Sequence, residues 1–408
     1  MIAVLALVIT GYNKNLETAN FAPNGLFSKF VATKGTSLMR GPCQPKTNLS
    51  FIKIHRAGSG TFHNVLVRFA ITHGTFLALS TCPYFDCYPR TLSELEFRPR
   101  PWHDNFTGYN MYIDHVRYDH DATFSILPEN TVIITQIREP LSHTKAYEQK
   151  ICRHASFKSL RNKGIKYKCG QNNNAFVLGY NKPALNNITD FRLYLDTLDK
   201  QLFHVNILEY LDESLVLLKR KMCWEMKDIL HFGIHIHGSG KINKINATIE
   251  EQKIAHRKVS PLDYDLYDFF YERQKREIKS HGTLFQEEVE EFLKVGKRFQ
   301  DFCDGFCSDF NRLSSRSPAA LRDLFTNTSI RFTPTQFYDS FSLTYTDCAM
   351  LKLVEIIIKR ILIYQMYPEL CRKNSKLARK LNIPCDTENY VIPGLVRESI
   401  EGDILRKC

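Results

Sequence analysis

The sequence predicts an α/β fold, in which a parallel sheet is flanked by helices, with a mainly helical C-terminal part. Short apolar segments beginning at Phe51, Thr131 and His204 are each followed by a segment with helical features. Strands that alternate with helices in this way favour a parallel sheet. A chain of 408 residues is long enough to bury a sizeable core around it.

The first strand ends among the cationic side chains of Lys53 and Arg56 and the titratable His55. A small Gly/Ser loop and an amphipathic helix follow, and Gly74 is expected to end this helix. The next segment, Thr75–Leu79, reads as a second strand.

Two further strands are predicted downstream. The segment Thr131–Ile137 is rich in β-branched residues, and Pro140 then occupies a favoured first position of a helix. The segment His204–Tyr210 is predicted as another strand. Asp212 is expected to cap the helix that follows, which should run from Glu213 to about Trp224.

The later part of the chain is predicted to be mainly helical and highly charged from about Leu262. The apolar segment Leu353–Tyr367 is interrupted by charges, which favours a helix packed in the core over one inserted in a membrane. His231, His235 and His237 lie close together, and a surface or core role is expected for them rather than a metal site.

The composition favours anionic partners and an oxidising compartment. The net charge is +12, yet no run of Lys and Arg exceeds three residues, so no nucleic acid partner is expected. Twelve cysteines without a CxxC pair fit disulfides, whose pairing the spacing leaves open. Cys303 and Cys307 would form a local disulfide or two separate bridges. Ile2–Ile9 reads as a buried strand or as the end of a signal or signal-anchor segment.

The loop after the first strand suits an anion. Backbone N–H groups at a helix N-terminus attract phosphate, and glycines such as Gly58 and Gly60 let the backbone approach it. The Walker A pattern is absent, because no Gly-Lys-Ser/Thr closes the loop. Arg138, just before Pro140, would add a cation at the same sheet edge. The alternatives are an ordinary strand–helix turn and a surface ion pair of Arg138.

Several motifs resemble those of the galactose 3-O-sulfotransferase family. FIKIHRAGSGT (51–61) is similar to its 5′-phosphosulfate loop, and IREP (137–140) is similar to its 3′-phosphate segment. The most specific match is YLDESLVLLKRKMCWEMKDIL (210–230), and LDYDLYDFF (262–270) is a weaker one. The resemblance covers roughly residues 50–300. It implies a P-loop-like fold, no metal, and sulfate transfer from 3′-phosphoadenosine 5′-phosphosulfate to the 3-hydroxyl of galactose on a glycolipid or glycan.

The resemblance also implies how the sulfate donor is held. The residues that take the 5′-phosphosulfate role are Lys53, Arg56, Gly58, Ser59, Gly60 and Thr61. Arg138 takes the 3′-phosphate role. Sulfotransferases commonly carry a serine eight residues after this arginine, where this chain has Ala146, and Ser142 and Thr144 lie nearby as substitutes.

Sulfate transfer to an alcohol needs a general base, and histidine is the commonest choice. His115 lies in MYIDHVRYD (111–119), which resembles a family segment with a histidine two residues before an arginine. We predict His115 as the base, with Asp114 or Asp119 orienting it, and His55 as the competing candidate. Lys53 and Arg56 would stabilise the charge that develops as the S–O bond breaks. The alternative for His115 is an ordinary core or surface role.

The family resemblance further implies a type II Golgi membrane protein with a lumenal catalytic domain. The expected organisation is a signal or signal-anchor segment at 1–10, a stem or linker at 11–50, a sulfotransferase domain at 51–300 and a helical extension of that domain at 301–408. Two rival interpretations remain open. One is a sulfotransferase of the same fold that acts on another sugar position, as in a glycosaminoglycan. The other is a non-catalytic relative that binds glycans or nucleotides.

Overall fold

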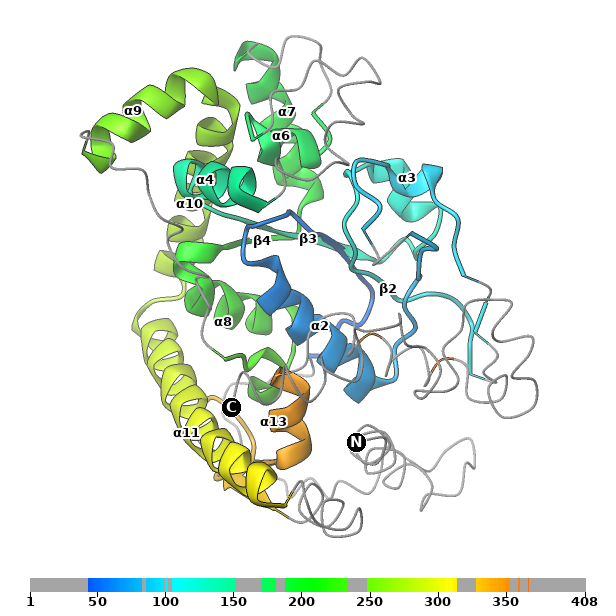
Figure 1. Ribbon diagram of the computed structural model, residues 1–408, viewed down its shortest axis with the longest axis vertical. Helices are drawn as coiled ribbons and strands as arrows, with labels where there is room; N and C mark the ends of the chain where they lie inside the picture. Colours follow the sequence, from blue (N-terminus) through cyan, green and yellow to red (C-terminus); the bar gives the residue numbers. More distant parts are fainter. Residues whose placement is uncertain are drawn as a thin grey trace.

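The computed structural model describes residues 43–82, 86–98, 100–101, 105–150, 170–180, 188–232, 248–313 and 328–352, and the single residues 359 and 366. Within these residues, parallel strands form a central sheet with helices on both faces (Figure 1). The predicted α/β fold is therefore confirmed. No helix in this described part of the chain is long and apolar enough to cross a membrane.

The order of the described strands across the sheet is β2-β1-β3-β4. Their bounds are Leu49–Ile52 for β1, Met111–Tyr112 for β2, Val132–Ile137 for β3 and His204–Ile207 for β4. Leu49 pairs with Val132, and Ile134 pairs with His204, both in parallel register. The strands therefore end at the same edge of the sheet, where the loops that follow them meet.

The prediction that Thr75–Leu79 forms a separate strand is wrong. Leu77 makes a single bridge to Met111, and Met111 pairs with Leu49 on its other side. The strand next to β1 is therefore β2, and the segment around Leu77 covers the outer edge of β2. An apolar segment reveals its tendency to be extended but not the strand with which it pairs.

The predicted cap at Asp212 is also wrong. Strand β4 ends at Ile207, a 3-10 turn (η3, Leu208–Tyr210) follows, and helix α8 already begins at Leu211. Asp212 therefore lies inside the first turn, where its carboxylate accepts a hydrogen bond from His231 Nε2 at 2.9 Å.

Helices cover both faces because neighbouring residues of a strand point to opposite sides. Phe51 lies in the apolar core formed with α2 and α8, whereas Ile52 lies in the core formed with α6, α7 and α10. The bounds are Ser59–His73 for α2, Leu211–Met222 for α8, Asn173–Val177 for α6, Ile188–Gln201 for α7 and Pro261–Ser280 for α10. As predicted, Gly74 ends α2 with a φ of 63°, and Pro140 opens α4 (Pro140–Lys150).

The described later part is mostly helical, as predicted, and adds a small antiparallel hairpin. Its elements are α9 (Ile249–Val259), α11 (Thr283–Leu313), β5 (Ser329–Phe332), β6 (Phe341–Thr344) and α13 (Tyr345–Lys352). A disulfide between Cys303 and Cys348 joins α11 to α13, so a local bridge from Cys303 to Cys307 is excluded. The predicted helix Leu353–Tyr367 lies outside the described residues, apart from Lys359 and Met366.

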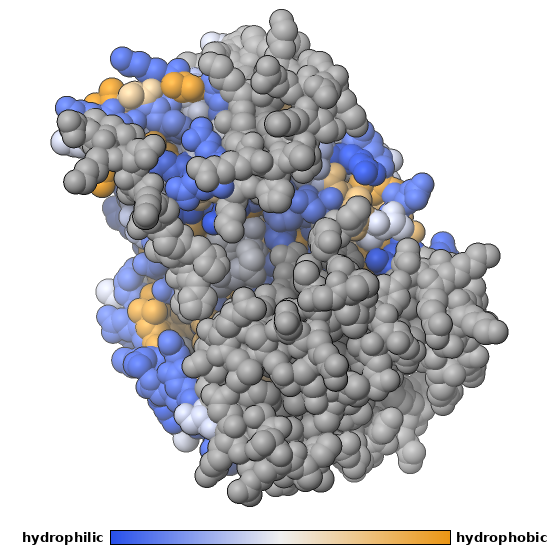
Figure 2. All heavy atoms as spheres, in the orientation of Figure 1, coloured by the Kyte–Doolittle hydropathy of each residue, from blue (hydrophilic) through white to orange (hydrophobic). Residues whose placement is uncertain are grey.

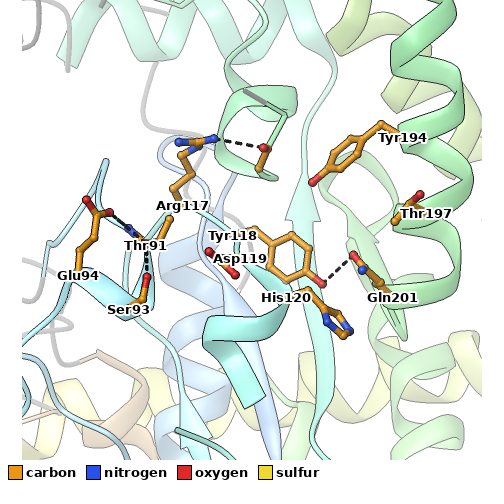
Figure 3. A pocket seen from close by; sticks show the side chains of 11 residues that line it. Thr91, Ser93, Glu94, Arg117, Tyr118, Asp119, His120, Tyr194, Thr197 and Gln201 are labelled. Carbon is orange, nitrogen blue, oxygen red and sulfur yellow. Dashed lines mark hydrogen bonds between the residues drawn. The ribbon is translucent and has the colours of Figure 1, made fainter. Parts of the chain in front are cut away.

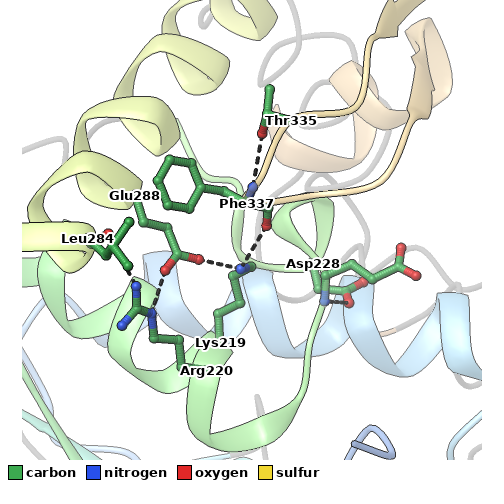
Figure 4. A network of polar contacts seen from close by, with 8 residues as sticks. Lys219, Arg220, Asp228, Leu284, Glu288, Thr335 and Phe337 are labelled. Carbon is green, nitrogen blue, oxygen red and sulfur yellow. Dashed lines mark hydrogen bonds and ion pairs between the residues drawn. The ribbon is translucent and has the colours of Figure 1, made fainter. Parts of the chain in front are cut away.

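Helix α11 is tied to α8 by a buried ionic network (Figure 4). Glu288 of α11 accepts hydrogen bonds from Lys219 Nζ and Arg220 Nε of α8. Lys219 also donates to the backbone oxygen of Phe337, in the hairpin, at 3.3 Å. One carboxylate therefore holds the helical C-terminal part against the sheet domain.

The Cys-Trp pair after α8 has a structural purpose. Cys223 forms a disulfide with Cys43, and the indole Nε1 of Trp224 donates to the backbone oxygen of Lys46 at 2.9 Å. The Trp224 ring also stacks on Phe69 of α2, with the ring centroids 4.1 Å apart. These contacts fix the chain that leads into β1, which carries the loop described below.

The described surface in Figure 2 is mainly hydrophilic, and apolar side chains show over α9 and at a few other places. Ile249, Ile254 and Val259 of this helix are exposed, and none of its residues is buried.

Candidate active site

The loop between β1 and α2 turns sharply at two residues with positive φ. Arg56 has a φ of 63° and Gly58 a φ of 73°. A Cβ atom at Gly58 would lie 2.3 Å from Leu208 Cδ1, so only glycine fits beside the end of β4. A non-glycine residue such as Arg56 enters the left-handed region only where its surroundings hold it there. The packing therefore fixes the path of this loop.

The N-terminus of α2 presents an open cradle for an anion. Gly60 is exposed, and a Cβ atom there would meet nothing within 4 Å. The first turn of α2 carries no acidic side chain, so the positive end of the helix dipole is not offset within the helix. The Ser59 hydroxyl donates to the backbone oxygen of Ile54 at 2.8 Å, which leaves Gly60 and Thr61 as the more accessible residues.

Two arginines from neighbouring strands meet at this loop. Arg138, which directly follows β3, donates from Nη1 to the backbone oxygen of Arg56 at 3.3 Å. The buried Nε atom of Arg56 has no hydrogen-bond partner among the described residues. Lys53 is also buried, with 2% of its surface exposed. Three cationic side chains therefore gather at this loop.

The start of α4 leaves one hydroxyl available beside Arg138. The carboxylate of Glu139 accepts hydrogen bonds from the backbone N–H groups of Leu141 at 3.2 Å and Ser142 at 2.8 Å, and so caps α4. Thr144 is buried and donates to the backbone oxygen of Gly170 at 3.0 Å. Of the two hydroxyls considered as substitutes for a serine at Ala146, only Ser142 is thus uncommitted to a backbone carbonyl among the described residues.

Two histidine rings lie against each other beside the loop. His115 follows β2, and its Nδ1 donates to the backbone oxygen of Lys53 at 2.8 Å. A carbonyl oxygen only accepts hydrogen bonds, so Nδ1 carries the proton and Nε2 is the basic nitrogen. The His115 ring stacks on His55, with ring centroids 3.6 Å apart. His55 in turn donates from Nε2 to Asp86 Oδ2 at 2.9 Å.

The surroundings keep His115 neutral. Burial, followed by the charges of His55 and Lys53, lowers its pKa well below the ordinary value for histidine. Burial on its own raises the pKa of Asp86, but the hydrogen bond and charge of His55 outweigh it and the pKa is lowered. The site thus combines a neutral imidazole with an ionised carboxylate one ring away.

The aspartates expected to orient His115 do not do so. Asp114 forms a buried ion pair with Lys359, and Asp119 accepts a hydrogen bond from the Ala122 N–H at 3.0 Å as the cap of α3 (His120–Phe124). The backbone oxygen of Lys53 orients the ring instead. This expectation was wrong for Asp114 because neighbouring residues of an extended segment point to opposite sides, and for Asp119 because its side chain caps the next helix.

Sequence reasoning missed Asp86 and Lys359. Asp86 lies next to Cys87, which forms a disulfide with Cys82, and its backbone bridges to His115. Lys359 is more than two hundred residues from the Asp114 that it pairs with. Neither residue belongs to a motif, so no local signal could have identified them.

The described residues contain no group of His, Cys, Asp and Glu that could hold a metal ion. His231 pairs with Asp212, while His235 and His237 lie outside the described residues.

Two known proteins with similar sequences are both named as sulfotransferases. The galactose-3-O-sulfotransferase family matches residues 1–309. The chain is 29% identical over 330 residues to galactose-3-O-sulfotransferase 3 of Bos taurus, covering 74% of each chain. It is 26% identical over 292 residues to galactosylceramide sulfotransferase of Homo sapiens, covering 64% of this chain and 65% of that protein. The chain therefore belongs to the galactose-3-O-sulfotransferase family and is an enzyme of that family, as its motifs predicted.

Proposed function

We propose that this enzyme transfers sulfate from 3′-phosphoadenosine 5′-phosphosulfate to the 3-hydroxyl of a terminal galactose. The observation that carries the proposal is the convergence, at one sheet edge, of the anion cradle of α2 with the neutral imidazole of His115, which is hydrogen-bonded to Lys53 of the same loop. Family membership supplies the reaction class. It does not choose between a glycolipid and a glycan, because relatives named for galactose and for galactosylceramide match about equally well.

In this proposal the loop after β1 holds the 5′-phosphosulfate, which supplies an activated sulfuryl group when it is bound. Lys53, Arg56, Gly58, Ser59, Gly60 and Thr61 form that part of the site. The unpartnered Nε of Arg56 and the open space at Gly60 both fit an anion there. Arg138 and Ser142 hold the 3′-phosphate, since Arg138 contacts the backbone of Arg56 and Ser142 lies in the first turn of α4, which follows Arg138 in the chain.

His115 acts as the general base. Its Nε2 takes the proton from the galactose 3-hydroxyl while the new O–S bond forms and the S–O bond to the 5′-phosphate breaks. Lys53, Arg56 and the N-terminus of α2 stabilise the negative charge that develops on that phosphate. The Lys53 carbonyl holds the tautomer in which Nε2 is free to accept.

The location is also a proposal. Disulfides such as Cys43–Cys223 fit the oxidising lumen of the secretory pathway, and we propose the Golgi lumen with a type II anchor. In the proposed organisation, residues 1–10 are part of a signal-anchor and residues 11–50 form a stem. Residues 51–300 form the sulfotransferase domain, and residues 301–408 are its extension.

The test is transfer of [³⁵S]sulfate from the labelled donor to a panel of β-galactosides and glycosaminoglycans, with the linkage of the product determined. Sulfate at the galactose 3-position is expected. Labelling of glycosaminoglycans alone would favour another sugar position, and labelling of no acceptor, with nucleotide binding retained, would favour a non-catalytic relative.

A further inference from the structure

A pocket of about 570 Å³ lies beyond the end of β2, between the short 3-10 helix η2 (Leu92–Glu94), the segment 117–120 and helix α7 (Figure 3). The site described above does not use it. Glu94 borders it on one side, Thr197 and Gln201 of α7 border it on the other, and Arg117 and Asp119 form the wall between them. The pocket lies near His115, the proposed general base.

The chemistry of the lining fits a polyhydroxylated ligand. Hydroxyl, carboxylate, amide and phenol groups face the pocket, and none of the described residues that line it carries an aliphatic side chain. An acyl chain would gain little there, because its burial would desolvate polar groups without replacing their hydrogen bonds. A sugar presents hydroxyls to such groups and its C–H face to rings such as Tyr194.

The charges in the pocket disfavour an anionic sugar. The guanidinium of Arg117 is partly engaged by the backbone, since Nε donates to the oxygen of Phe176 at 3.3 Å and Nη2 to that of Gly179 at 3.2 Å. Glu94 and Asp119 add negative charge. A uronic acid or a sialic acid would therefore meet two carboxylates and a single arginine, whose guanidinium already donates to two backbone oxygens.

One lining residue is already oriented to donate. Gln201 Oε1 accepts a hydrogen bond from the Tyr118 hydroxyl at 3.1 Å, which fixes the direction of the side-chain amide (Figure 3). The amide nitrogen is then the group left to donate to a ligand oxygen. Asp119 uses Oδ1 for the cap of α3, so Oδ2 can accept from a ligand hydroxyl.

The pocket lies close to the imidazole pair. Arg117 follows His115 by two residues, which limits the separation of their Cα atoms to about 7 Å. Packed rings also link the two places, because the His55 ring lies 5.3 Å from Tyr88, Tyr88 lies 6.2 Å from Phe176, and Arg117 Cζ lies 4.8 Å from Phe176. A short oligosaccharide with its terminal galactose at His115 would reach the pocket with its next sugars.

We propose that this pocket binds the neutral sugar residues next to the acceptor galactose. The inference rests on the proposed sulfate transfer and sharpens it: the preferred acceptor is an uncharged oligosaccharide that ends in galactose, rather than a galactose linked directly to a lipid.

Two substitutions on exposed positions of α7 form a matched test. Thr197→Trp places a large ring in the pocket, whereas Asp196→Trp places the same ring on a neighbouring exposed position that does not line it. Thr197→Trp should raise the KM for a neutral tetrasaccharide with a terminal β-galactose by about tenfold or more, equivalent to about 1.4 kcal/mol. The KM for methyl β-galactoside and for the donor should stay unchanged, and Asp196→Trp should alter none of them.

The outcomes separate the two proposals. If Thr197→Trp affects both acceptors equally, or neither, the pocket does not bind the acceptor chain. If the unaltered enzyme sulfates no galactoside, the proposed function fails instead. Saturation-transfer NMR with the same tetrasaccharide then tests the pocket directly: binding that survives Asp196→Trp but not Thr197→Trp supports the site, and binding that survives both, or is absent from the unaltered enzyme, overturns it. A sialylated tetrasaccharide should bind more weakly than the neutral one, and tighter binding would contradict the charge argument.

Discussion

The imidazole ring of His115 lies nearly parallel to that of His55, with the centroids 3.6 Å apart and the planes 9° apart. Two positively charged rings at this distance would repel each other strongly. Asp86 sits on the far side of this pair and accepts a hydrogen bond from His55 at 2.9 Å. The negative charge therefore lies on Asp86, and His115 keeps a neutral ring with a nitrogen that can accept a proton.

Replacement of His115 by alanine should lower kcat by about 10²- to 10⁴-fold, because the galactose hydroxyl loses its proton acceptor. Donor affinity should stay nearly unchanged, as measured by calorimetry with 3′,5′-bisphosphoadenosine. His281→Ala, at the end of α10, is the control and should leave both quantities unaffected. A loss of donor affinity without a loss of kcat would make His115 a binding residue.

The rate should depend on pH through the same residue. Burial and the charges of His55 and Lys53 lower the pKa of His115, so it stays neutral as the pH falls through the ordinary histidine value of about 6.5. The acid limb of kcat should lie below that value, and activity should be lost only as the pH falls further. His55→Phe keeps a ring against His115 but removes one of these charges, so the limb should move to higher pH. An unmoved limb would show that His115 is not the titrating group.

Arg56→Ala should lower turnover by about 10²- to 10³-fold while the protein stays folded, because a fixed cation beside the developing charge is lost. Initial rates at saturating donor give the effect, and circular dichroism gives the folded state. Arg331→Ala, an exposed arginine in β5, is the matched control. Near-normal turnover of Arg56→Ala would remove this side chain from the mechanism.

Arg138→Ala should weaken binding of 3′,5′-bisphosphoadenosine far more than that of adenosine 5′-phosphate. An arginine–phosphate pair is a charge-assisted contact, and only the first ligand has a 3′-phosphate. Titration calorimetry with both nucleotides gives the ratio. Ser142→Ala should show the same selectivity to a smaller degree, about 1 kcal/mol. Equal losses for the two ligands would mean that Arg138 is structural, and an unchanged Ser142 variant would mean that Ser142 does not replace the serine missing at Ala146.

Glu288→Ala should destabilise the protein by about 3 to 5 kcal/mol, because Lys219 and Arg220 would lose their shared carboxylate in a largely buried place. Denaturant unfolding measures the change. Glu290→Ala, an exposed acid on the same helix, should change the stability by less than about 0.5 kcal/mol. Similar stability of the two variants would contradict the view that this network joins the C-terminal part to the sheet domain.

The sequence by itself determined the features that depend on neighbouring residues. The β-branched residues of Val132–Ile137 favoured a strand, Gly74 ended α2, and Pro140 opened α4, because local backbone preferences and apolar spacing act within a few residues. The loop between β1 and α2 followed from the same rules. The family followed from specific motifs, above all the segment around Trp224.

Only the tertiary structure decided which distant groups meet. Strand β2 lies beside β1 in place of the segment around Leu77, His115 is oriented by the Lys53 carbonyl instead of an aspartate, and Asp86 completes the histidine pair. The pocket beside Arg117 likewise draws its walls from segments about one hundred residues apart in the chain. Such contacts are set by how strands pair and how side chains fill the space between elements, and that information is spread over the whole chain rather than held in any one motif.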